Sequence, residues 1–160
     1  MTLAICPGSF DPITIGHLDI ITRASKIFDR VIVVVSFNAA KDKYAFAIDE
    51  RIMLVQKAIE HLPNVVVDSC DELLADYAKA RGADAIVKGL RAMSDFEYEF
   101  QMALFNKKVN PDAETIFLTA APENMYLSSS LVKQVASFGG DISEFVPSCI
   151  LSEVEKRLKQ

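Results

Sequence analysis

Apolar residues follow two alternating patterns along the chain. Five short continuous runs, typical of strands covered on both faces, span residues 3–6, 31–35, 65–67, 85–87 and 115–118. Between the runs, apolar residues recur every three or four positions, as in amphipathic helices, over residues 17–28, 48–62, 73–81, 94–109, 128–138 and 148–158. Strands that alternate with helices in this way form right-handed βαβ units. The pattern therefore predicts an α/β fold in which a single domain, residues 1–160, contains a doubly wound five-stranded parallel sheet.

Polar residues and glycines indicate where two of these helices begin and end. We expect Asp71 to cap the N-terminus of the third helix and Gly82 to end that helix in a left-handed conformation. Ser94 and Glu97 have the spacing of a capping box, which predicts the start of the fourth helix.

In doubly wound sheets, ligands bind beyond the carboxyl ends of the strands, where the strand order reverses. The loops that leave these ends are therefore the candidate site loops. They span residues 7–17, 37–43, 69–74, 88–91 and 119–130.

The first of these loops, CPGSFDPITIGH at residues 6–17, has the composition of a phosphate-binding loop. Gly8 allows the backbone to approach a ligand closely, and the two prolines prevent a regular hydrogen-bonded ladder. Gly16 begins a helix whose N-terminal N–H groups and dipole favour an anion, and His17 lies in its first turn. Taken singly these residues also fit an ordinary turn, whereas together they indicate a phosphate site.

A second group of candidate residues follows the fourth strand. Gly89 allows close approach of the backbone to a ligand, and the planar guanidinium of Arg91 suits phosphate oxygens. Glu99 lies farther along the next helix, and its spacing alone favours an exposed carboxylate that pairs with a nearby basic side chain over a ligand contact. A third group, the hydroxyls of residues 128–130, offers donors to a phosphate at a helix start. The chemistry alone favours their role as a helix cap, and we expect Ser128 to be the N-cap of the helix that ends at Phe138.

Composition narrows the class of partner. The chain is 51% hydrophobic and 24% charged with a net charge of −5, which argues against a protein that mainly binds nucleic acid. Three scattered cysteines predict neither a disulfide framework nor a metal site, and no apolar run is long enough to cross a membrane, so we expect a cytoplasmic protein. Basic side chains that could bind a small polyanion are Lys41, Lys43, Lys88, Arg91, Lys107, Lys108 and Lys133.

The motifs resemble those of a known superfamily. GSFDP at residues 8–12 followed by TIGH at 14–17 is similar to the paired signature of the nucleotidylyltransferases, and the serines at 128–130 match their second segment. GLRAMSDFEYE at 89–99 and SSSLVK at 128–133 narrow the resemblance, over essentially the whole chain, to the bacterial phosphopantetheine adenylyltransferases. This resemblance implies a Rossmann-like nucleotidylyltransferase fold and reversible adenylyl transfer from ATP to 4′-phosphopantetheine, the penultimate step of coenzyme A synthesis. It also implies a need for Mg²⁺ and a homohexamer.

Roles for individual residues follow from the same resemblance. It implies catalytic roles for His17, Lys41 and Arg91, and substrate-binding roles for Ser9, Lys41, Leu74 and Lys88. It implies ATP-binding roles for Ser9, Phe10, His17, Gly89, Leu90, Arg91, Glu99, Asn124, Met125, Tyr126, Leu127, Ser128, Ser129 and Ser130. No metal ligands are identified.

Some positions depart from the family pattern. Ser9 stands where threonine is usual but keeps the hydroxyl, and Lys88 stands where arginine is usual, keeping the charge without the bidentate geometry. Asn124 and Met125 also differ from some relatives. Two alternatives remain open: a nucleotidylyltransferase with another acceptor, such as nicotinamide mononucleotide, and a non-catalytic module that senses ATP.

Overall fold

The computed structural model describes residues 1–37 and 43–159. Five parallel strands form one sheet in the order β3-β2-β1-β4-β5. The strands are β1 (Leu3–Gly8), β2 (Arg30–Ser36), β3 (Val65–Cys70), β4 (Ala85–Leu90) and β5 (Glu114–Thr119). The predicted fold class is confirmed, and each strand extends beyond the apolar run that predicted it.

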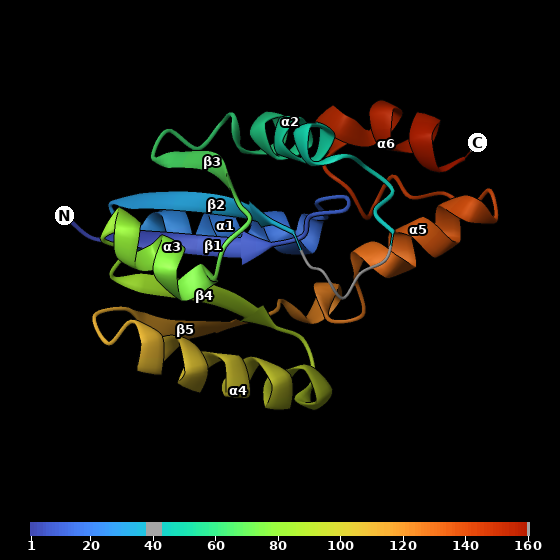
Figure 1. Ribbon diagram of the computed structural model, residues 1–160. Coiled ribbons are helices and arrows are strands. Elements are labelled where there is room, and N and C mark those ends of the chain that lie inside the picture. The colour runs from blue at the N-terminus through green and yellow to red at the C-terminus, as the bar shows by residue number, and fades with distance from the viewer. Residues whose placement is uncertain (38–42, 160) are drawn as a thin grey trace.

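Helices cover both faces of the sheet (Figure 1). The helices are α1 (Ile15–Ile27), α2 (Ile48–Ile59), α3 (Leu74–Arg81), α4 (Met93–Val109), α5 (Ser129–Ser137) and α6 (Leu151–Leu158), with 3-10 turns η1 (Pro122–Asn124) and η2 (Ser148–Ile150). One buried cluster joins α1, α2, α5 and α6 to side chains such as Ala4 and Cys6 of β1. A smaller cluster joins α3 to the intervening Ile5, so successive residues of β1 are buried on opposite faces.

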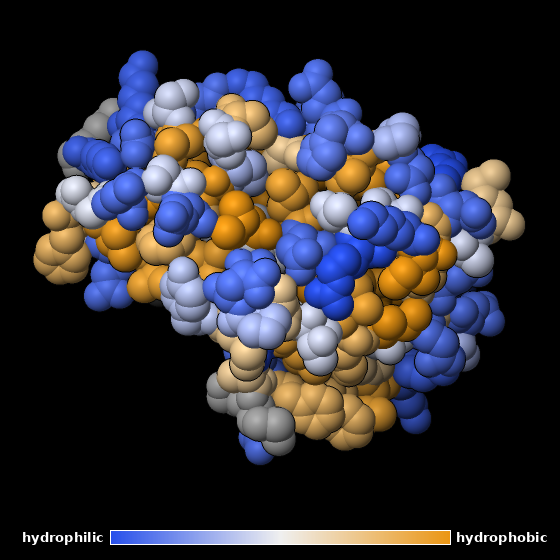
Figure 2. All heavy atoms as spheres, turned by 180° about the vertical axis from the view of Figure 1, so that it is seen from behind, coloured by the Kyte–Doolittle hydropathy of each residue, from blue (hydrophilic) through white to orange (hydrophobic). Residues whose placement is uncertain are grey.

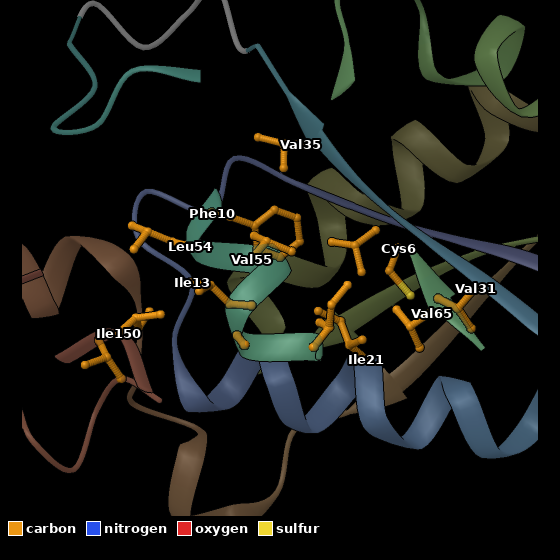
Figure 3. Packing of buried hydrophobic residues seen from close by; sticks show 14 of the residues in the cluster. Cys6, Phe10, Ile13, Ile21, Val31, Val35, Leu54, Val55, Val65 and Ile150 are labelled. Atoms are coloured by element: carbon orange, nitrogen blue, oxygen red, sulfur yellow. The ribbon is translucent and has the colours of Figure 1, made fainter. Parts of the chain in front are cut away.

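Figure 3 shows the larger cluster at the end of the sheet near the first loop. The Phe10 ring comes from that loop and lies among Val35, Leu54 and Val55, and it is only 4% exposed. The loop that was predicted to bind phosphate is thus anchored in the core by its own aromatic side chain.

Two predicted helix caps are wrong. Leu73, not Asp71, is the N-cap residue of α3, and its side chain makes no capping hydrogen bond. Helix α4 begins at Met93 and its N-cap residue is Ala92, so Ser94 lies inside the helix and is not its N-cap residue. The predicted end of α3 is confirmed, because Gly82 has a φ of 65° and its N–H reaches back to the last carbonyls of the helix.

The sheet opens where its strand order reverses. β1 pairs with β2 at six positions, from Leu3 opposite Arg30 to Gly8 opposite Val35. With β4 it pairs only at Ala4 and Ile5, although both strands are described in full. β1 and β4 therefore separate toward their carboxyl ends, at the place where a doubly wound sheet binds its ligand.

Candidate active site

A cavity of about 360 Å³ lies at this opening between β1 and β4. It is lined by the first loop, the N-terminus of α1, the end of β4, the first half of α4 and the start of α5. Most of the predicted site residues line it: Ser9, Phe10, His17, Lys88, Gly89, Arg91, Glu99, Asn124, Leu127, Ser128, Ser129 and Ser130.

Other predicted site residues are not in the lining. Leu74 packs against the smaller buried cluster under α3. Met125 and Tyr126 are exposed and precede α5 in the sequence. Leu90 also lies outside the lining. Lys41 falls outside the described residues, so its predicted role stays a prediction.

The first loop is shaped by Gly8 and Phe10. Phe10 has a φ of 48°, a conformation that non-glycine residues rarely adopt. A Cβ on Gly8 would lie 3.0 Å from the Phe10 ring, closer than most Cβ contacts, so the glycine leaves room for the ring to fold back beneath the loop. The buried ring also meets the imidazole of His17 edge-on, with centroids 5.1 Å apart, and supports it from below.

His17 is fixed by Thr14, a residue that the sequence reading did not assign to the site. Thr14 caps α1, and its Oγ1 accepts a hydrogen bond from the backbone N–H of His17 at 3.3 Å. In return the backbone N–H of Thr14 donates to Nδ1 of His17 at 3.0 Å. Because Nδ1 is an acceptor here, the proton of the neutral imidazole lies on Nε2, which makes Nε2 a hydrogen-bond donor.

The start of α5 is tied to the first loop. Ser128 caps the helix by accepting from the N–H of Leu131 at 3.1 Å, as predicted, and the Ser129 hydroxyl donates to the carbonyl of Pro12 at 2.7 Å. The N-termini of α1 and α5 therefore both border the cavity, and each carries the partial positive charge of a helix dipole. This arrangement suits a ligand with several phosphates.

Four charged side chains of the cavity form two ion pairs. Lys88 Nζ lies 3.3 Å from a Glu99 carboxylate oxygen, and Arg91 Nε lies 3.5 Å from Asp95. The pairing role considered for Glu99 is thus present in the structure. Arg91 also donates to the Leu127 carbonyl at 2.8 Å, which joins the end of β4 to the start of α5. A phosphate that binds either cation must compete with a carboxylate that already holds it.

Gly89 has a packing role beyond the one predicted. A Cβ at this position would lie 2.9 Å from Cγ1 of Ile20, so α1 approaches β4 too closely for any larger residue. A Cβ on Gly16 would meet its nearest neighbour at 3.5 Å, an ordinary contact. Packing within the protein therefore requires glycine at 89 but not at 16.

Cys6 lies in the cavity wall but is not suited to covalent chemistry. Burial raises the pKa of its thiol to about 12, and the nearby charge of Lys88 offsets only part of that effect. Since the thiolate is the nucleophilic form, the buried thiol is inert near neutral pH.

The described residues contain no group of three or more histidine, cysteine, aspartate or glutamate side chains that could hold a metal ion. Asp95 and Glu99 place two carboxylates in the cavity wall. Mg²⁺ commonly uses one or two carboxylates together with substrate phosphates and water, so the cavity is compatible with a magnesium–nucleotide complex.

No helix among the described residues is long and apolar enough to cross a membrane.

Comparisons with known proteins agree with the motifs. The profile of the cytidylyltransferase-like family matches residues 5–135. Phosphopantetheine adenylyltransferase of Caldanaerobacter subterraneus subsp. tengcongensis is 55% identical over 160 residues, covering all of this chain and 99% of that protein. The enzyme of the same name from Clostridium tetani is 54% identical, covering 98% of both chains.

A solved structure shares the fold at lower identity. The crystal structure of a Vibrio parahaemolyticus protein assigned as a nicotinate-nucleotide adenylyltransferase superposes with a TM-score of 0.67. It is 19% identical, and the match covers 98% of this chain and 96% of that one. The fold likeness, the family profile and the full-length identities lead to one conclusion: this chain belongs to the phosphopantetheine adenylyltransferase family of cytidylyltransferase-like proteins.

Proposed function

We propose that this protein catalyses the reversible transfer of an adenylyl group from ATP to 4′-phosphopantetheine, giving dephospho-coenzyme A and pyrophosphate. The observation that carries this proposal is identity of 51–55% over nearly the full length with relatives that are named phosphopantetheine adenylyltransferase. The cavity supports it, because two helix N-termini and two cations converge where phosphates would lie. We place this penultimate step of coenzyme A synthesis in the cytoplasm.

The proposed transfer needs no general base. A phosphate oxygen of the acceptor attacks the α-phosphorus of ATP, and the bond to the bridging oxygen of pyrophosphate breaks. The attacking phosphate is already ionised near neutral pH, so no proton needs to be removed. The protein must align the two phosphates and stabilise the added negative charge in the transition state.

His17 is the side chain best placed to stabilise that charge. Its Nδ1 is held by Thr14, so Nε2 can donate a hydrogen bond to an oxygen of the α-phosphate. Arg91 and Lys88 supply positive charge at the end of β4, and we propose that Lys41, which lies outside the described residues, supplies positive charge as well. Bound Mg²⁺ would neutralise phosphate charge beside Asp95 and Glu99.

The first experiment is pyrophosphate release from ATP with Mg²⁺ and one of three acceptors: 4′-phosphopantetheine, nicotinamide mononucleotide or glycerol 3-phosphate. Release with the first acceptor alone supports the proposal. Release with nicotinamide mononucleotide instead would identify another adenylyltransferase. ATP binding without release for any acceptor would favour a sensing module.

His17→Ala tests the assigned role within this assay. We expect kcat to fall roughly 10²- to 10³-fold, the usual effect of removing one donor to a developing oxyanion. The chain has one other histidine, the exposed His61, and His61→Ala is the control that should leave kcat unchanged. A near-normal kcat in the His17 variant would contradict its role.

We also propose that the protein is a homo-oligomer, a hexamer by its family resemblance. Figure 2 shows apolar side chains in the lower part of the molecule, where α4 lies. Exposed apolar residues of α4 include Tyr98, Phe100, Leu104 and Phe105, so its outer surface is suited to cover by another copy. Leu104→Glu should lower the mass measured by light scattering, whereas Phe138→Glu, at an exposed position after α5, should not. A monomeric wild-type protein would contradict this proposal.

A further inference from the structure

Arg51 is a buried cation that does not line the cavity. It lies on the core-facing side of α2 and is 2% exposed, the largest of the fully buried side chains among the described residues. Burying a guanidinium removes its hydration, so such a residue is tolerated only where several acceptors replace the lost water. Its partners therefore indicate what it holds in place.

Three carbonyl groups from separate segments accept hydrogen bonds from Arg51. Nη1 donates to the carbonyl of Ser9 in the first loop at 2.8 Å and to that of Ser36 at the end of β2 at 3.2 Å. Nε donates to the carbonyl of Phe46, just before α2, at 3.2 Å. One side chain thus joins the carboxyl ends of β1 and β2 to the segment that leads into α2.

Asp11 holds the same segment from the opposite side. Its carboxylate is buried and accepts hydrogen bonds from the N–H groups of Ala45 and Phe46, both at 2.9 Å. It also pairs with Lys133 of α5 at 3.1 Å. The peptide around Phe46 is therefore fixed through its N–H by the first loop and through its carbonyl by Arg51.

An aromatic side chain completes the surroundings of Arg51. The guanidinium carbon lies 4.1 Å from the centroid of the Tyr44 ring, within the range of a cation–π contact. The Tyr44 ring in turn lies 5.8 Å from that of Phe37, which follows β2. A planar group that stacks on a ring and donates to three carbonyls matches the fork of arginine, which lysine cannot reproduce.

We infer that Arg51 is a positioning residue for the phosphate-binding loop, acting through the Ser9 carbonyl. This inference rests on the proposed function. Ser9 lines the cavity, whereas Arg51 lies behind it and reaches the substrates only through the backbone it holds. Because small displacements of aligned groups have large effects on transfer rates, the position of this carbonyl bears on kcat as well as on stability.

Arg51→Lys tests the inference, with Arg157→Lys as its matched control. Arg157 of α6 is exposed and also donates to this segment, at the Ala45 carbonyl at 2.9 Å, but it has no hydrogen bond to Ser9 among the described contacts. Pyrophosphate release and melting temperature would be measured for both, with kinetics well below the lower melting temperature. We expect kcat to fall about 10- to 100-fold in Arg51→Lys and to stay within about twofold in Arg157→Lys.

A purely structural residue would lower the melting temperature alone. The inference is therefore overturned if Arg51→Lys melts at a lower temperature while kcat and both KM values stay within about twofold of wild type. Should that variant not fold, Tyr44→Leu weakens the same cluster from its more exposed side, and Tyr44→Phe keeps the ring as control. We then expect kcat to fall a few-fold in Tyr44→Leu alone, and an unchanged kcat would overturn the inference.

Failure of the proposed function gives a different result. Wild-type protein would then release no pyrophosphate with 4′-phosphopantetheine. The Kd of ATP would test Arg51 separately, because a displaced first loop should weaken binding of the phosphates in Arg51→Lys but not in Arg157→Lys. Equal Kd values in both variants and wild type would overturn the inference in that case.

Discussion

The Thr14 hydroxyl lies 3.1 Å from Nδ1 of His17, the same nitrogen that accepts the backbone N–H of Thr14. The two residues are three positions apart at the start of α1 and form a reciprocal capping box, with histidine in the place usually taken by glutamate or glutamine. One local contact therefore begins the helix and also sets the tautomer of the imidazole at the cavity.

Substitutions at Thr14 should show how far helix stability and the orientation of His17 depend on the hydroxyl and how far on the backbone N–H. Thr14→Val keeps the N–H but removes the hydroxyl, so we expect about 1 kcal/mol of lost stability from the missing cap. We also expect kcat to fall about tenfold because the imidazole is less firmly oriented. Thr14→Ser restores the hydroxyl and should recover both the melting temperature and kcat. An unchanged kcat in Thr14→Val would show that the backbone N–H alone positions His17.

Removing the carboxylate beside Arg91 should strengthen nucleotide binding. In Asp95→Asn the cation no longer has an anionic partner that competes with phosphate. Because the pair is partly exposed, we expect the Kd of ATP, measured by calorimetry without Mg²⁺, to fall by at most about fivefold, corresponding to about 1 kcal/mol. Asp19→Asn, which breaks the Asp19–Arg23 pair on α1, is the control. Weaker ATP binding in Asp95→Asn would instead indicate that this carboxylate helps to hold the nucleotide complex.

Alanine at Gly89 and at Gly16 should have different effects. Gly89→Ala forces its Cβ against Ile20, so we expect about 1–3 kcal/mol of destabilisation, relieved when Ile20→Ala is added. Gly16→Ala has room for its Cβ and should unfold at nearly the wild-type denaturant concentration. If Gly16→Ala loses activity while keeping its stability, the space above Gly16 belongs to a substrate. Equal destabilisation of the two variants would contradict this account.

The pH dependence of stability should reveal the Tyr77–Asp68 hydrogen bond, in which the Tyr77 hydroxyl donates to the carboxylate at 2.7 Å. This bond lowers the pKa of Asp68 below 3.8, and burial together with the same bond raises the pKa of Tyr77 above 10.0. The stabilisation from Asp68 is present above pH 3.8 and is lost as pH falls through its lowered pKa. The stabilisation from Tyr77 is present below pH 10.0 and is lost as pH rises through its raised pKa.

Tyr77→Phe should therefore be less stable than wild type by about 1 kcal/mol between about pH 5 and pH 9, and the difference should shrink on either side. Urea titrations across that range would measure it. Tyr126→Phe, at an exposed tyrosine outside both the cavity lining and α4, is the control and should match wild type throughout. A constant difference down to about pH 2 would show that Asp68 is not the partner responsible.

Much of the fold was predictable because its signals are local. Continuous apolar runs identified each strand, and the alternation of strands and helices implied a parallel sheet with a site at the reversal of its order. The caps at Asp71 and Ser94 were wrong because several nearby residues can begin a helix, and packing selects among them. The cap at Ser128 was predicted correctly. Its position is also favoured by tertiary structure, because the neighbouring Ser129 hydroxyl donates to the Pro12 carbonyl.

The site was predictable in its motifs but not in its supporting contacts. Thr14 and His17 have the spacing of a capping box, a signal that could have been used. Arg51 offered no such signal, because an arginine in an amphipathic helix is expected on the exposed side, and Ser9 is 42 positions away. Asp11 and Lys133 are 122 positions apart, so only the folded chain brings them together.

The separation of β1 and β4 after Ile5 and Ile86 lies where the strand order of the sheet reverses. Its existence depends on strand order, which a protein can keep while most of its residues change, as the 19% identity to a structure of the same fold illustrates. Residues that line the cavity, such as Lys88 of β4, can then change while the strand order is kept. Over evolution, the preference for an acceptor can drift while the space for a nucleotide is inherited with the topology.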